Sequence, residues 1–393
     1  MRTQVGIIGA GPAGLMLAHL LHRLGIDSVV LERATREHIE HRIRAGVLEQ
    51  GTVDLLDEIG LSARLHRECL VHSGLEVLFD GVGHRIPLTE LTGRGVTIYA
   101  QHELVKDLVA ARLDTGRPLV FEAPATGIDD LTGPRPVIRG THQGREVELH
   151  CDFVAGCDGF HGVSRPAVPA GAITAYDHQY PYSWLGVLAQ APPSSEELIY
   201  AHTGDGFALH SMRTPEITRL YLQVAPDERL AEWPDERIWA ELANRLHRRD
   251  GFQLNTGPLL DKGITALRSY VTEPMRHGRL FLAGDSAHIV PATGAKGLNL
   301  AVADVYVLAA ALDEWYTSGS GAGLDAYSDN CLRRVWRVQH FSWWMTSMLH
   351  RPPHADPFGE RLQLSQLRYL TSSTAAATSF AENYVGLPLP KGG

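Results

Sequence analysis

Hydrophobic positions near the N-terminus predict a parallel α/β core. Residues 4–8 form a short apolar run, residues 12–24 place apolar side chains at helical spacing after a glycine-rich turn, and residues 27–32 form a second apolar run. A strand, a crossover helix and a second strand within about 30 residues make a βαβ unit, whose strands pair in parallel. The chain therefore begins with the first unit of a doubly wound sheet.

The remaining pattern predicts an antiparallel insertion and a helical end. We expect a helix over 103–113, short antiparallel strands over 119–154, β-rich structure over 180–270 with one helix near 235–248, a strand over 277–284 and a long helix over 294–316. Everything after about residue 325 has helical spacing and ends in a turn-rich tail, 386–393. This order predicts an α/β fold with a doubly wound core, an inserted antiparallel-sheet domain and a helical C-terminal region.

Composition narrows the class of protein. The 393 residues are 44% apolar and 21% charged, as in ordinary folded proteins. A net charge of −9 argues against a dedicated nucleic-acid binder, which needs basic side chains to neutralise phosphates. Four cysteines without a CxxC pair argue against a disulfide framework or a zinc site, and we expect at least three of them to be buried. Glycines break the apolar stretch 5–21, and Asp304 interrupts 298–312, so we expect a cytoplasmic protein without a membrane partner.

A glycine fingerprint follows the first predicted strand. Gly9, Gly11 and Gly14 fit GxGxxG, with Ala13 inside the motif at the start of the predicted helix. The first glycine permits the tight turn, the second lets a pyrophosphate approach the backbone, and the third packs the helix against the strand. Glu32 ends the second predicted strand, where an acid holds a ribose hydroxyl. These residues predict a dinucleotide site.

Two later segments identify the nucleotide by resemblance. Cys157-Asp158-Gly159 follows an apolar strand, and Gly284-Asp285 ends another. With the glycine fingerprint, in this order, they resemble the three FAD-binding signatures of the single-component FAD-dependent aromatic hydroxylases. The chain has only one GxGxxG motif, so the resemblance implies non-covalently bound resident FAD, with NADPH or NADH as a transient co-substrate.

The resemblance covers essentially the whole chain and is strongest to the family members that hydroxylate 4-hydroxybenzoate. It implies hydroxylation at C3 to 3,4-dihydroxybenzoate (protocatechuate) with O₂, through a flavin C4a-hydroperoxide. It also implies an FAD-binding domain over 1–175 and 271–330, a substrate domain over 176–270 to which 70–100 contributes, and a helical region over 331–393 that could form a homodimer interface. The stretches that carry it are 42–51, 156–162, 198–201, 285–291, 294–299, 341–346 and 382–388.

Substrate-site residues transfer position by position from this resemblance. Ser211, Arg213 and Tyr221 match the trio that holds a benzoate carboxylate, for which a planar guanidinium is well suited. Without the family match, Ser211 and Arg213 could equally alternate on a solvated strand face. The other implied residues are Tyr200 and Tyr384 as a hydrogen-bonded pair that moves the phenol proton, His72 as its outlet to solvent, and Ala292, whose carbonyl accepts from the substrate phenol. The family usually has proline at position 292, so we expect a less preorganised loop there.

Cofactor residues follow in the same way. The resemblance assigns FAD contacts to Gly9, Gly11, Ala13, Gly14, Glu32, Arg42, Arg44, Val47, Gln101, Asp158, Asp285, Gly297, Leu298 and Asn299, with the start of the long helix aimed at the flavin. It assigns NAD(P)H contacts to Arg33, His38, Arg42, His161, Arg165 and Arg268. Arginines and glutamates alternate over 33–42, so both donors are expected to work, unless these charges form only a solvated helix face.

Three other functions compete with this interpretation. A sister enzyme would act on another benzoate, such as 3-hydroxybenzoate or 4-aminobenzoate. A catalytically silent flavin-fold binding protein would have an eroded pyrophosphate loop, whereas all three glycines and Asp285 are present. A plain NAD-dependent dehydrogenase would lack the Asp-Gly and Gly-Asp segments. The aromatic segment 341–345 could be buried core or a dimer face.

Overall fold

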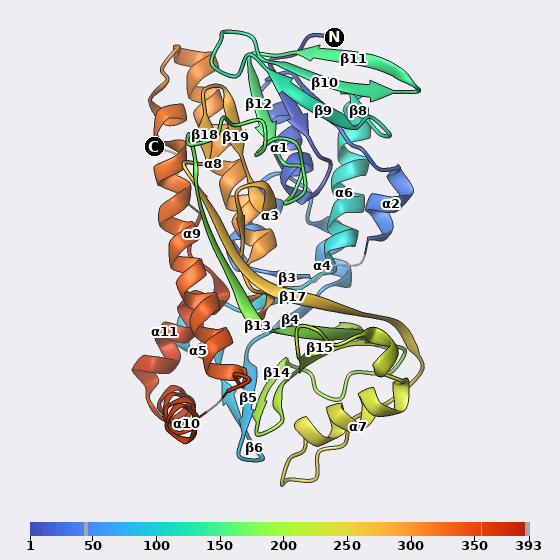
Figure 1. Ribbon diagram of the computed structural model, residues 1–393, viewed down its shortest axis with the longest axis vertical. Helices are drawn as coiled ribbons and strands as arrows, with labels where there is room; N and C mark the ends of the chain where they lie inside the picture. The colour runs from blue at the N-terminus through green and yellow to red at the C-terminus, as the bar shows by residue number, and fades with distance from the viewer. Residues whose placement is uncertain (43–45, 355, 390–393) are drawn as a thin grey trace.

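A parallel sheet forms the upper half of the molecule in Figure 1. The computed structural model describes residues 1–42, 46–354 and 356–389. Strands β1 and β2 pair in parallel around helix α1, as the sequence predicts. The sheet order is β18 (Arg276–His277), β19 (Leu280–Leu282), β12 (Phe153–Gly156), β1 (Val5–Ile8), β2 (Ser28–Leu31) and β8 (Leu119–Val120), with only β18 antiparallel. Helices α1 (Pro12–Arg23), α6 (Gln101–Asp114) and α8 (Gly297–Ser318) pack beside it.

An eight-stranded sheet forms the lower half. Its order is β20 (His288–Ile289), β17 (Leu259–Glu273), β13 (Thr174–Ala189), β16 (Ile217–Val224), β15 (Gly206–Thr214), β14 (Ile199–Thr203), β5 (Leu75–Phe79) and β6 (Val82–Ile86). All neighbours are antiparallel except β14 and β5. The long strands β13 and β17 run from the upper half into the lower one (Figure 1), so a single pair of strands joins the two sheets.

Smaller elements complete the chain. Two three-stranded sheets have the orders β11 (Arg145–His150), β10 (Val137–His142), β9 (Ala125–Asp129) and β3 (Val47–Leu48), β7 (Val96–Ile98), β4 (Leu70–His72). The other helices are α2 (Arg36–His41), α3 (Gln50–Glu58), α4 (Ala63–Glu68), α5 (Leu88–Thr92), α7 (Asp235–Arg245), α9 (Ala322–Leu349), α10 (Pro357–Ser372) and α11 (Thr374–Val385), with short turns η1 (Leu230–Glu232), η2 (Gly284–Ser286) and η3 (Ala292–Gly294). Helix α9 runs along both halves in Figure 1.

Three sequence predictions need correction. Within 119–154 only β9, β10 and β11 are antiparallel, because β8 and β12 join the parallel sheet beside β2 and β1. The helix expected from 294 begins at Gly297, since Ala295 is left-handed (φ 54°) and ends a separate turn. The helix near 235–248 ends at Arg245. Local spacing shows neither the strand partner nor a left-handed residue.

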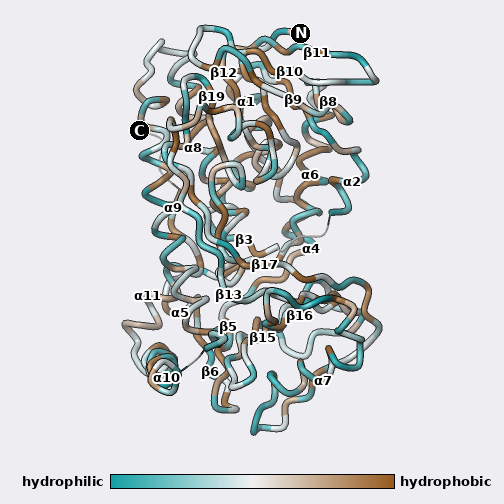
Figure 2. Tube along the Cα trace, viewed as in Figure 1, coloured by the Kyte–Doolittle hydropathy of each residue, from teal (hydrophilic) through white to brown (hydrophobic). Residues whose placement is uncertain are grey.

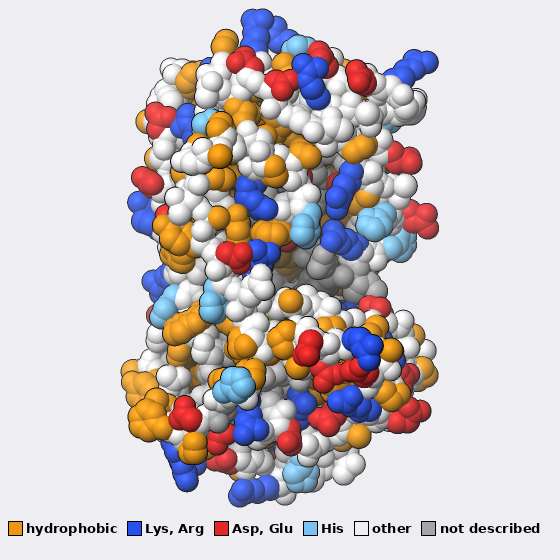
Figure 3. Space-filling view, in the orientation of Figure 1, with side chains coloured by type: hydrophobic (Ala, Val, Ile, Leu, Met, Phe, Trp, Pro, Cys, Tyr) orange, Lys and Arg blue, Asp and Glu red, His pale blue; other side chains and the backbone are white. Residues whose placement is uncertain are grey.

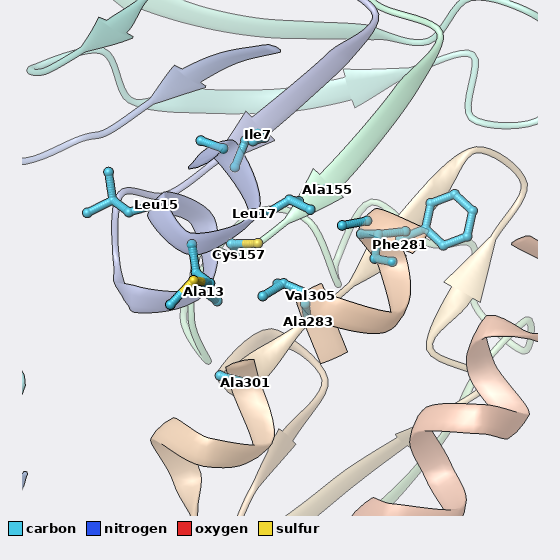
Figure 4. Packing of buried hydrophobic residues seen from close by; sticks show 14 of the residues in the cluster. Ile7, Ala13, Leu15, Leu17, Ala155, Cys157, Phe281, Ala283, Ala301 and Val305 are labelled. Carbon is cyan, nitrogen blue, oxygen red and sulfur yellow. The ribbon is translucent and has the colours of Figure 1, made fainter. Parts of the chain in front are cut away.

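Apolar packing holds each half together. In the upper half, side chains from β1, α1, β12, β19 and α8 meet in one cluster, part of which Figure 4 shows. The eight-stranded sheet has a core on each face, one shared with α9 and α11 and one covered by α7. In Figure 2 the inner strands and α8 are mostly brown, whereas the outer helices α2 and α7 carry more teal. Cys151, Cys157 and Cys331 are buried, as predicted. Among the described residues, every helix is too short or too polar to cross a membrane.

Candidate active site

The glycine loop between β1 and α1 has the geometry that a pyrophosphate requires. Gly9 has φ 101°, and a Cβ there would lie 2.4 Å from the Cys157 carbonyl oxygen. A Cβ on Gly14 would lie 2.0 Å from the Gly9 oxygen, whereas one on Gly11 would meet nothing within 4 Å. Neighbouring backbone therefore closes the loop at Gly9 and Gly14, whereas the space beside Gly11 is open. This space lies next to the first turn of α1, where helix geometry leaves backbone N–H groups without an intrahelical acceptor.

Glu32 fixes this loop from the end of β2. Its carboxylate accepts hydrogen bonds from the backbone N–H of Ala10 (2.7 Å) and of Ala34 (2.8 Å). The side chain is buried, so it links the loop to β2 in addition to the ribose contact expected of it.

Asp158 presents a carboxylate oxygen with no partner. Oδ2 accepts from the Ser164 N–H and hydroxyl, both at 2.9 Å, whereas buried Oδ1 has no hydrogen bond among the described residues. Burial raises the pKa of Asp158, and the Ser164 hydrogen bonds partly oppose this. A Cβ on Gly162 would lie 2.0 Å from the Asp158 carboxyl carbon, so glycine is required for the carboxylate to fit. An orphaned acceptor fits a group that donates a hydrogen bond, such as the FAD or the nicotinamide nucleotide expected there.

The starts of α1 and α8 converge on Gly284, next to Asp285. A Cβ on Gly284 would lie 3.1 Å from the Ala301 Cβ and 3.6 Å from the Ala13 Cβ. Asp285 is exposed on η2 beside this junction. Figure 4 shows Ala13 and Ala301 on facing helices. Two helix N-termini, a glycine loop and an exposed acid at one place fit the phosphates and polyol of FAD.

Asn299 has a second role that the sequence did not predict. Its Oδ1 accepts from the Glu49 N–H (2.9 Å) and the Thr52 hydroxyl (2.8 Å), and its Nδ2 donates to the Val47 carbonyl (3.0 Å). The amide therefore holds β3 and α3 against the start of α8. Gly297, Leu298 and Gln101 are half-buried, Arg42 is exposed, and Arg44 lies outside the described residues.

The substrate candidates meet on one face of the eight-stranded sheet. One row of directly paired residues crosses four neighbouring strands: Tyr200 on β14, Leu209 on β15, Tyr221 on β16 and Gly186 on β13. Directly paired residues point to the same side of a sheet, so these side chains share a face. A Cβ on Gly186 would lie 3.0 Å from the Tyr221 ring, which therefore packs over this glycine. The structure thus brings together tyrosines that lie 21 positions apart in the chain.

Arg213 and Ser211 lie on the same strand, β15, as Leu209. Arg213 interacts electrostatically with Tyr221, its Nη1 donates to the Met212 carbonyl at 3.0 Å, and its buried Nε has no hydrogen bond among the described residues. Desolvation lowers the pKa of Arg213, and no carboxylate of the described chain opposes this shift. The Ser211 side chain is buried. Arg213 is half-buried, and a partly desolvated guanidinium without a counter-ion among the described residues is suited to binding an anion.

Tyr200 and Tyr384 form the expected pair. Their hydroxyl oxygens are 2.7 Å apart, and both side chains are buried. Burial raises the pKa of both phenols, so neither is ionised at neutral pH. His72 is also buried, burial lowers its pKa to about 4, and both ring nitrogens lack partners in the described part of the chain. No hydrogen bond among the described residues joins His72 to the tyrosine pair, so its role as the outlet of the proton stays a prediction.

The loop before α8 presents Ala292. Its side chain is exposed, and its carbonyl accepts from the Ala295 N–H at 2.9 Å. A carbonyl has two lone pairs, so this bond leaves one free for a substrate phenol. Without the ring of proline, this turn bond keeps the carbonyl oriented.

Comparisons with known proteins assign the family. A family model described as "FAD binding domain" matches residues 2–342. The p-hydroxybenzoate hydroxylase of Acinetobacter baylyi is 48% identical over 389 residues, which cover 99% of this chain and 96% of that protein. The chain belongs to the FAD-dependent aromatic hydroxylases.

More distant similarities agree with this assignment. A probable NADH-specific resorcinol 4-hydroxylase of Rhodococcus jostii is 25% identical, covering 83% of this hydroxylase and 61% of its own length. Among solved structures, p-nitrophenol 4-monooxygenase from Pseudomonas putida DLL-E4 has a TM-score of 0.83 at 18% identity, with 97% of each chain covered. That last likeness is evidence for a common fold alone. The doubly wound core, the antiparallel insertion and the helical C-terminal region are those of the family.

Three of the residues expected to contact NAD(P)H in the hydroxylase gather around Phe160. The guanidinium carbons of Arg165 and Arg268 each lie 4.3 Å from its ring centroid, and the His161 ring lies 5.0 Å away. Arg268 also pairs with Asp177 (Nε to Oδ1, 2.7 Å), so part of its charge is already neutralised. The other candidates, Arg33, His38 and Arg42, are exposed on or beside α2.

Two further side chains near the site, Lys296 and Arg219, were not predicted from the sequence. Buried Lys296 donates to Glu49 (2.8 Å) and to the Tyr384 carbonyl (2.6 Å), which ties α8 to β3 and α11. Arg219 lies 5.2 Å from the Tyr221 centroid, and its Nε and Nη1 have no hydrogen bonds among the described residues. A lysine or an arginine in a sequence usually lies at the surface, so the residue type gave no indication of these contacts. The clearest indication for Lys296 was that 294–299 and 42–51, the two stretches it joins, both resemble the family.

Buried histidines predict a steep loss of stability in mild acid. His72, His210 and His350 are buried, and burial lowers their pKa values to about 4, 4 and 3. Below pH 6.5 the unfolded chain binds protons that the folded chain does not, so stability falls as the pH falls toward these values. Each histidine contributes a loss of about 1 kcal/mol per pH unit between pH 6 and 5.

Chemical denaturation of the holoenzyme at pH 7, 6 and 5 with excess FAD checks this expectation. His210→Gln should flatten the pH dependence of the free energy of unfolding, whereas His247→Gln, at an exposed position, should leave it unchanged. A free energy of unfolding that stays constant from pH 7 to 5 contradicts the prediction.

Proposed function

We propose that this hydroxylase converts 4-hydroxybenzoate into 3,4-dihydroxybenzoate with FAD, O₂ and NAD(P)H. The observation that carries the proposal is a sheet face that holds two groups: the half-buried Arg213 beside Tyr221, for which the described residues supply no counter-ion, and the buried phenol pair of Tyr200 and Tyr384. Tyr200 and Tyr221 lie two strands apart, about 10 Å between their Cα atoms, with Leu209 of β15 between them. This spacing suits a single ring with a carboxylate at one end and a phenol at the other. The name of the Acinetobacter relative supports the same substrate.

In this proposal the carboxylate end supplies binding and orientation. Arg213 pairs with the substrate carboxylate through its planar fork, and Ser211 and Tyr221 donate hydrogen bonds from their hydroxyls. The desolvated charge pair holds the ring in one orientation, with C3 toward the cofactor.

At the end of the site that would hold the substrate phenol, the side chains transfer a proton. Tyr200 accepts the substrate phenol proton while donating its own to Tyr384, and His72 exchanges that proton with solvent. Before this transfer, the Ala292 carbonyl accepts a hydrogen bond from the substrate phenol, which then turns its proton to Tyr200. Phenolate formation raises the electron density at the carbon ortho to oxygen, which is the carbon to be hydroxylated.

The same proposal assigns the cofactor residues. When bound, FAD would supply the redox chemistry, which is acceptance of a hydride from the nicotinamide nucleotide and activation of O₂. The loop over 9–14, Glu32 and Asp285 would hold its phosphates and sugars, and the start of α8 at Gly297 and Leu298 would face its ring. Asp158 and the Phe160 cluster of His161, Arg165 and Arg268 would meet the nicotinamide nucleotide. FAD is then bound by 1–175 and 271–330, and the substrate by 176–270 with 70–100.

Oxidation of NAD(P)H in the presence of single benzoates tests the proposal. Purified holoenzyme is given 4-hydroxybenzoate, 3-hydroxybenzoate or 4-aminobenzoate, and the product is identified by chromatography. We expect rapid oxidation and 3,4-dihydroxybenzoate only from 4-hydroxybenzoate. Better turnover of another benzoate would assign the enzyme to a sister activity, and a preparation without a flavin spectrum would refute an FAD enzyme.

Both nicotinamide donors should work. Arg36 on α2 pairs with Glu40 (2.7 Å), and both Glu37 and Arg33 are exposed, so the 2′-phosphate of NADPH meets opposing charges there. We expect kcat/KM for NADPH to exceed that for NADH by less than about a hundredfold, or roughly 2.7 kcal/mol. Glu40→Ala should raise this preference by freeing Arg36, and Asp129→Ala, which removes an exposed acid from β9, should not. A larger preference in the unaltered enzyme would show that the glutamates have no influence.

We further propose that the enzyme is a cytoplasmic homodimer. Its nicotinamide donor is an intracellular metabolite. The C-terminal helix α10 exposes Phe358, Leu362 and Tyr369, 73%, 51% and 61% exposed, at spacings of four and seven that put them on one face. Figure 3 shows hydrophobic side chains gathered at the lower left, where α10 lies in Figure 1. The segment 341–345 is mainly core, since Phe341 and Met345 are buried. Phe358→Asp should convert a dimer into a monomer in sedimentation experiments.

A further inference from the structure

His350 ends α9 in a buried position and has no part in the groups described above. Its Nε2 is 2.6 Å from Trp184 Nε1, and its Nδ1 is 2.9 Å from the Thr346 carbonyl oxygen. An indole N–H can only donate, so Nε2 accepts and the ring proton sits on Nδ1, which donates to the carbonyl. Both bonds exist only for a neutral imidazole in this tautomer. Burial lowers the pKa of His350 to about 3, so the ring keeps this state at neutral pH.

The hydrogen bond sets the orientation of Trp184. The indole stacks on Phe207, with ring centroids 5.2 Å apart and planes 15° apart, and His350 stacks on Phe207 at 4.4 Å. On the other side of His350, Tyr182 stacks at 4.7 Å. Stacking on Phe207 and the hydrogen bond from Nε1 to His350 together fix the orientation of the Trp184 ring.

Trp184 in turn forms a wall for the proposed carboxylate site. Its ring centroid is 4.8 Å from that of Tyr221, which packs over Gly186 two residues farther along β13. Arg213 interacts electrostatically with Tyr221. The Tyr221 ring therefore lies between the Trp184 indole and the backbone of Gly186. A tilt of the indole would move the Tyr221 ring and with it the Tyr221 hydroxyl.

The same turn of α9 also reaches the other end of the site. The Thr346 hydroxyl is 2.8 Å from the Thr293 hydroxyl, which follows Ala292 in the loop before α8. Thr346 thus bonds the Ala292 loop through its side chain and His350 through its carbonyl. One helical turn contacts both ends of the sheet face on which the substrate candidates lie.

We infer that His350 is a positioning residue for the substrate carboxylate, acting through Trp184 on Tyr221 and Arg213. This inference rests on the proposed function. Loss of the acceptor leaves the indole N–H buried and unpaired, so the indole turns to find another partner and Tyr221 loses its support. The affected property is recognition of the carboxylate, and chemistry on a saturated enzyme is spared.

The test compares a charged substrate with its uncharged isostere in the FAD holoenzyme. Dissociation constants for 4-hydroxybenzoate and 4-hydroxybenzamide are measured by calorimetry, with KM and kcat for 4-hydroxybenzoate. We expect His350→Phe to weaken 4-hydroxybenzoate binding about tenfold, with less than about a twofold change for the amide and in kcat. His350→Gln should recover most of the affinity, because its amide oxygen can accept the indole proton.

Two further variants keep the result interpretable. Trp184→Phe removes the same hydrogen bond from the other side and should cause the same selective loss, including where His350→Phe does not fold. His202 also bonds the last turn of α9, at the Leu349 carbonyl (3.0 Å), and is not bonded to Trp184, so His202→Phe is the matched control and should leave both affinities unchanged.

Equal weakening of acid and amide, or an unchanged affinity for the acid in both His350→Phe and Trp184→Phe, overturns the inference. An equal effect of His202→Phe does so as well, because it would show general loosening of α9. If the unaltered enzyme hydroxylates a different benzoate, the proposed function fails separately, and the same variants are measured with that benzoate and its amide.

Discussion

Replacing Arg213 with alanine should raise the KM for 4-hydroxybenzoate by between about 30-fold and several thousand-fold, because removing one partner of a buried charge pair costs roughly 2–5 kcal/mol. Arg213 is a half-buried cation for which the described chain supplies no counter-ion, so the substrate carboxylate, which would bury it further, is its proposed partner. FAD content should stay unchanged, since the candidate FAD residues lie on other elements. Steady-state kinetics and the flavin absorbance of the purified variant measure both quantities.

Two variants separate charge from geometry at this position. Arg213→Lys keeps the positive charge without the planar fork, so its KM should lie between those of the unaltered enzyme and the alanine variant. Arg237→Ala removes an exposed arginine from α7, on the opposite face of the same sheet, and should change nothing. An Arg213→Ala enzyme with an unchanged KM would exclude Arg213 from the substrate site.

Replacing Tyr200 with phenylalanine should leave substrate binding within about threefold and lower the rate of hydroxylation by about a hundredfold, the low end of what a positioned proton-transfer group contributes. The hydroxyl is the only group lost, and it lies 2.7 Å from that of Tyr384. Without it the substrate phenol keeps its proton, and the electrons from NAD(P)H are released as hydrogen peroxide. The ratio of product to NAD(P)H consumed, with peroxide measured in parallel, reports the effect.

Tyr180→Phe is the matched control for this prediction. Tyr180 is also buried in the lower half, and its hydroxyl bonds Ser269 at 3.1 Å, away from Tyr384. Its loss should change stability slightly and leave coupling of NAD(P)H oxidation to product formation intact. A normal product yield from Tyr200→Phe would end the assignment of the tyrosine pair to proton movement.

Elements with a strong local signature were predictable from sequence. The strand–glycine turn–helix over 4–24 was predicted because Gly9 needs a left-handed backbone and Gly14 needs close approach, requirements that only glycine meets. Helices α6 and α8 were predicted within a few residues at each end because their apolar spacing is long. Short strands were not predictable in this way, because β8 has only two residues, and only its parallel pairing with β2 places it in the upper sheet.

The sequence by itself determined the FAD-dependent family, the doubly wound fold and the identity of the candidate site residues, because these reside in glycine positions and in long runs of matching residues. Only the tertiary structure decided which groups meet. It aligned Tyr200 with Tyr221 across the sheet and gave Arg213 no counter-ion among the described residues. It also bonded Asn299 to β3 and His350 to Trp184. Such contacts span up to hundreds of positions along the chain, and pairing at that separation depends on the register of strands and the packing of helices, which no local pattern encodes.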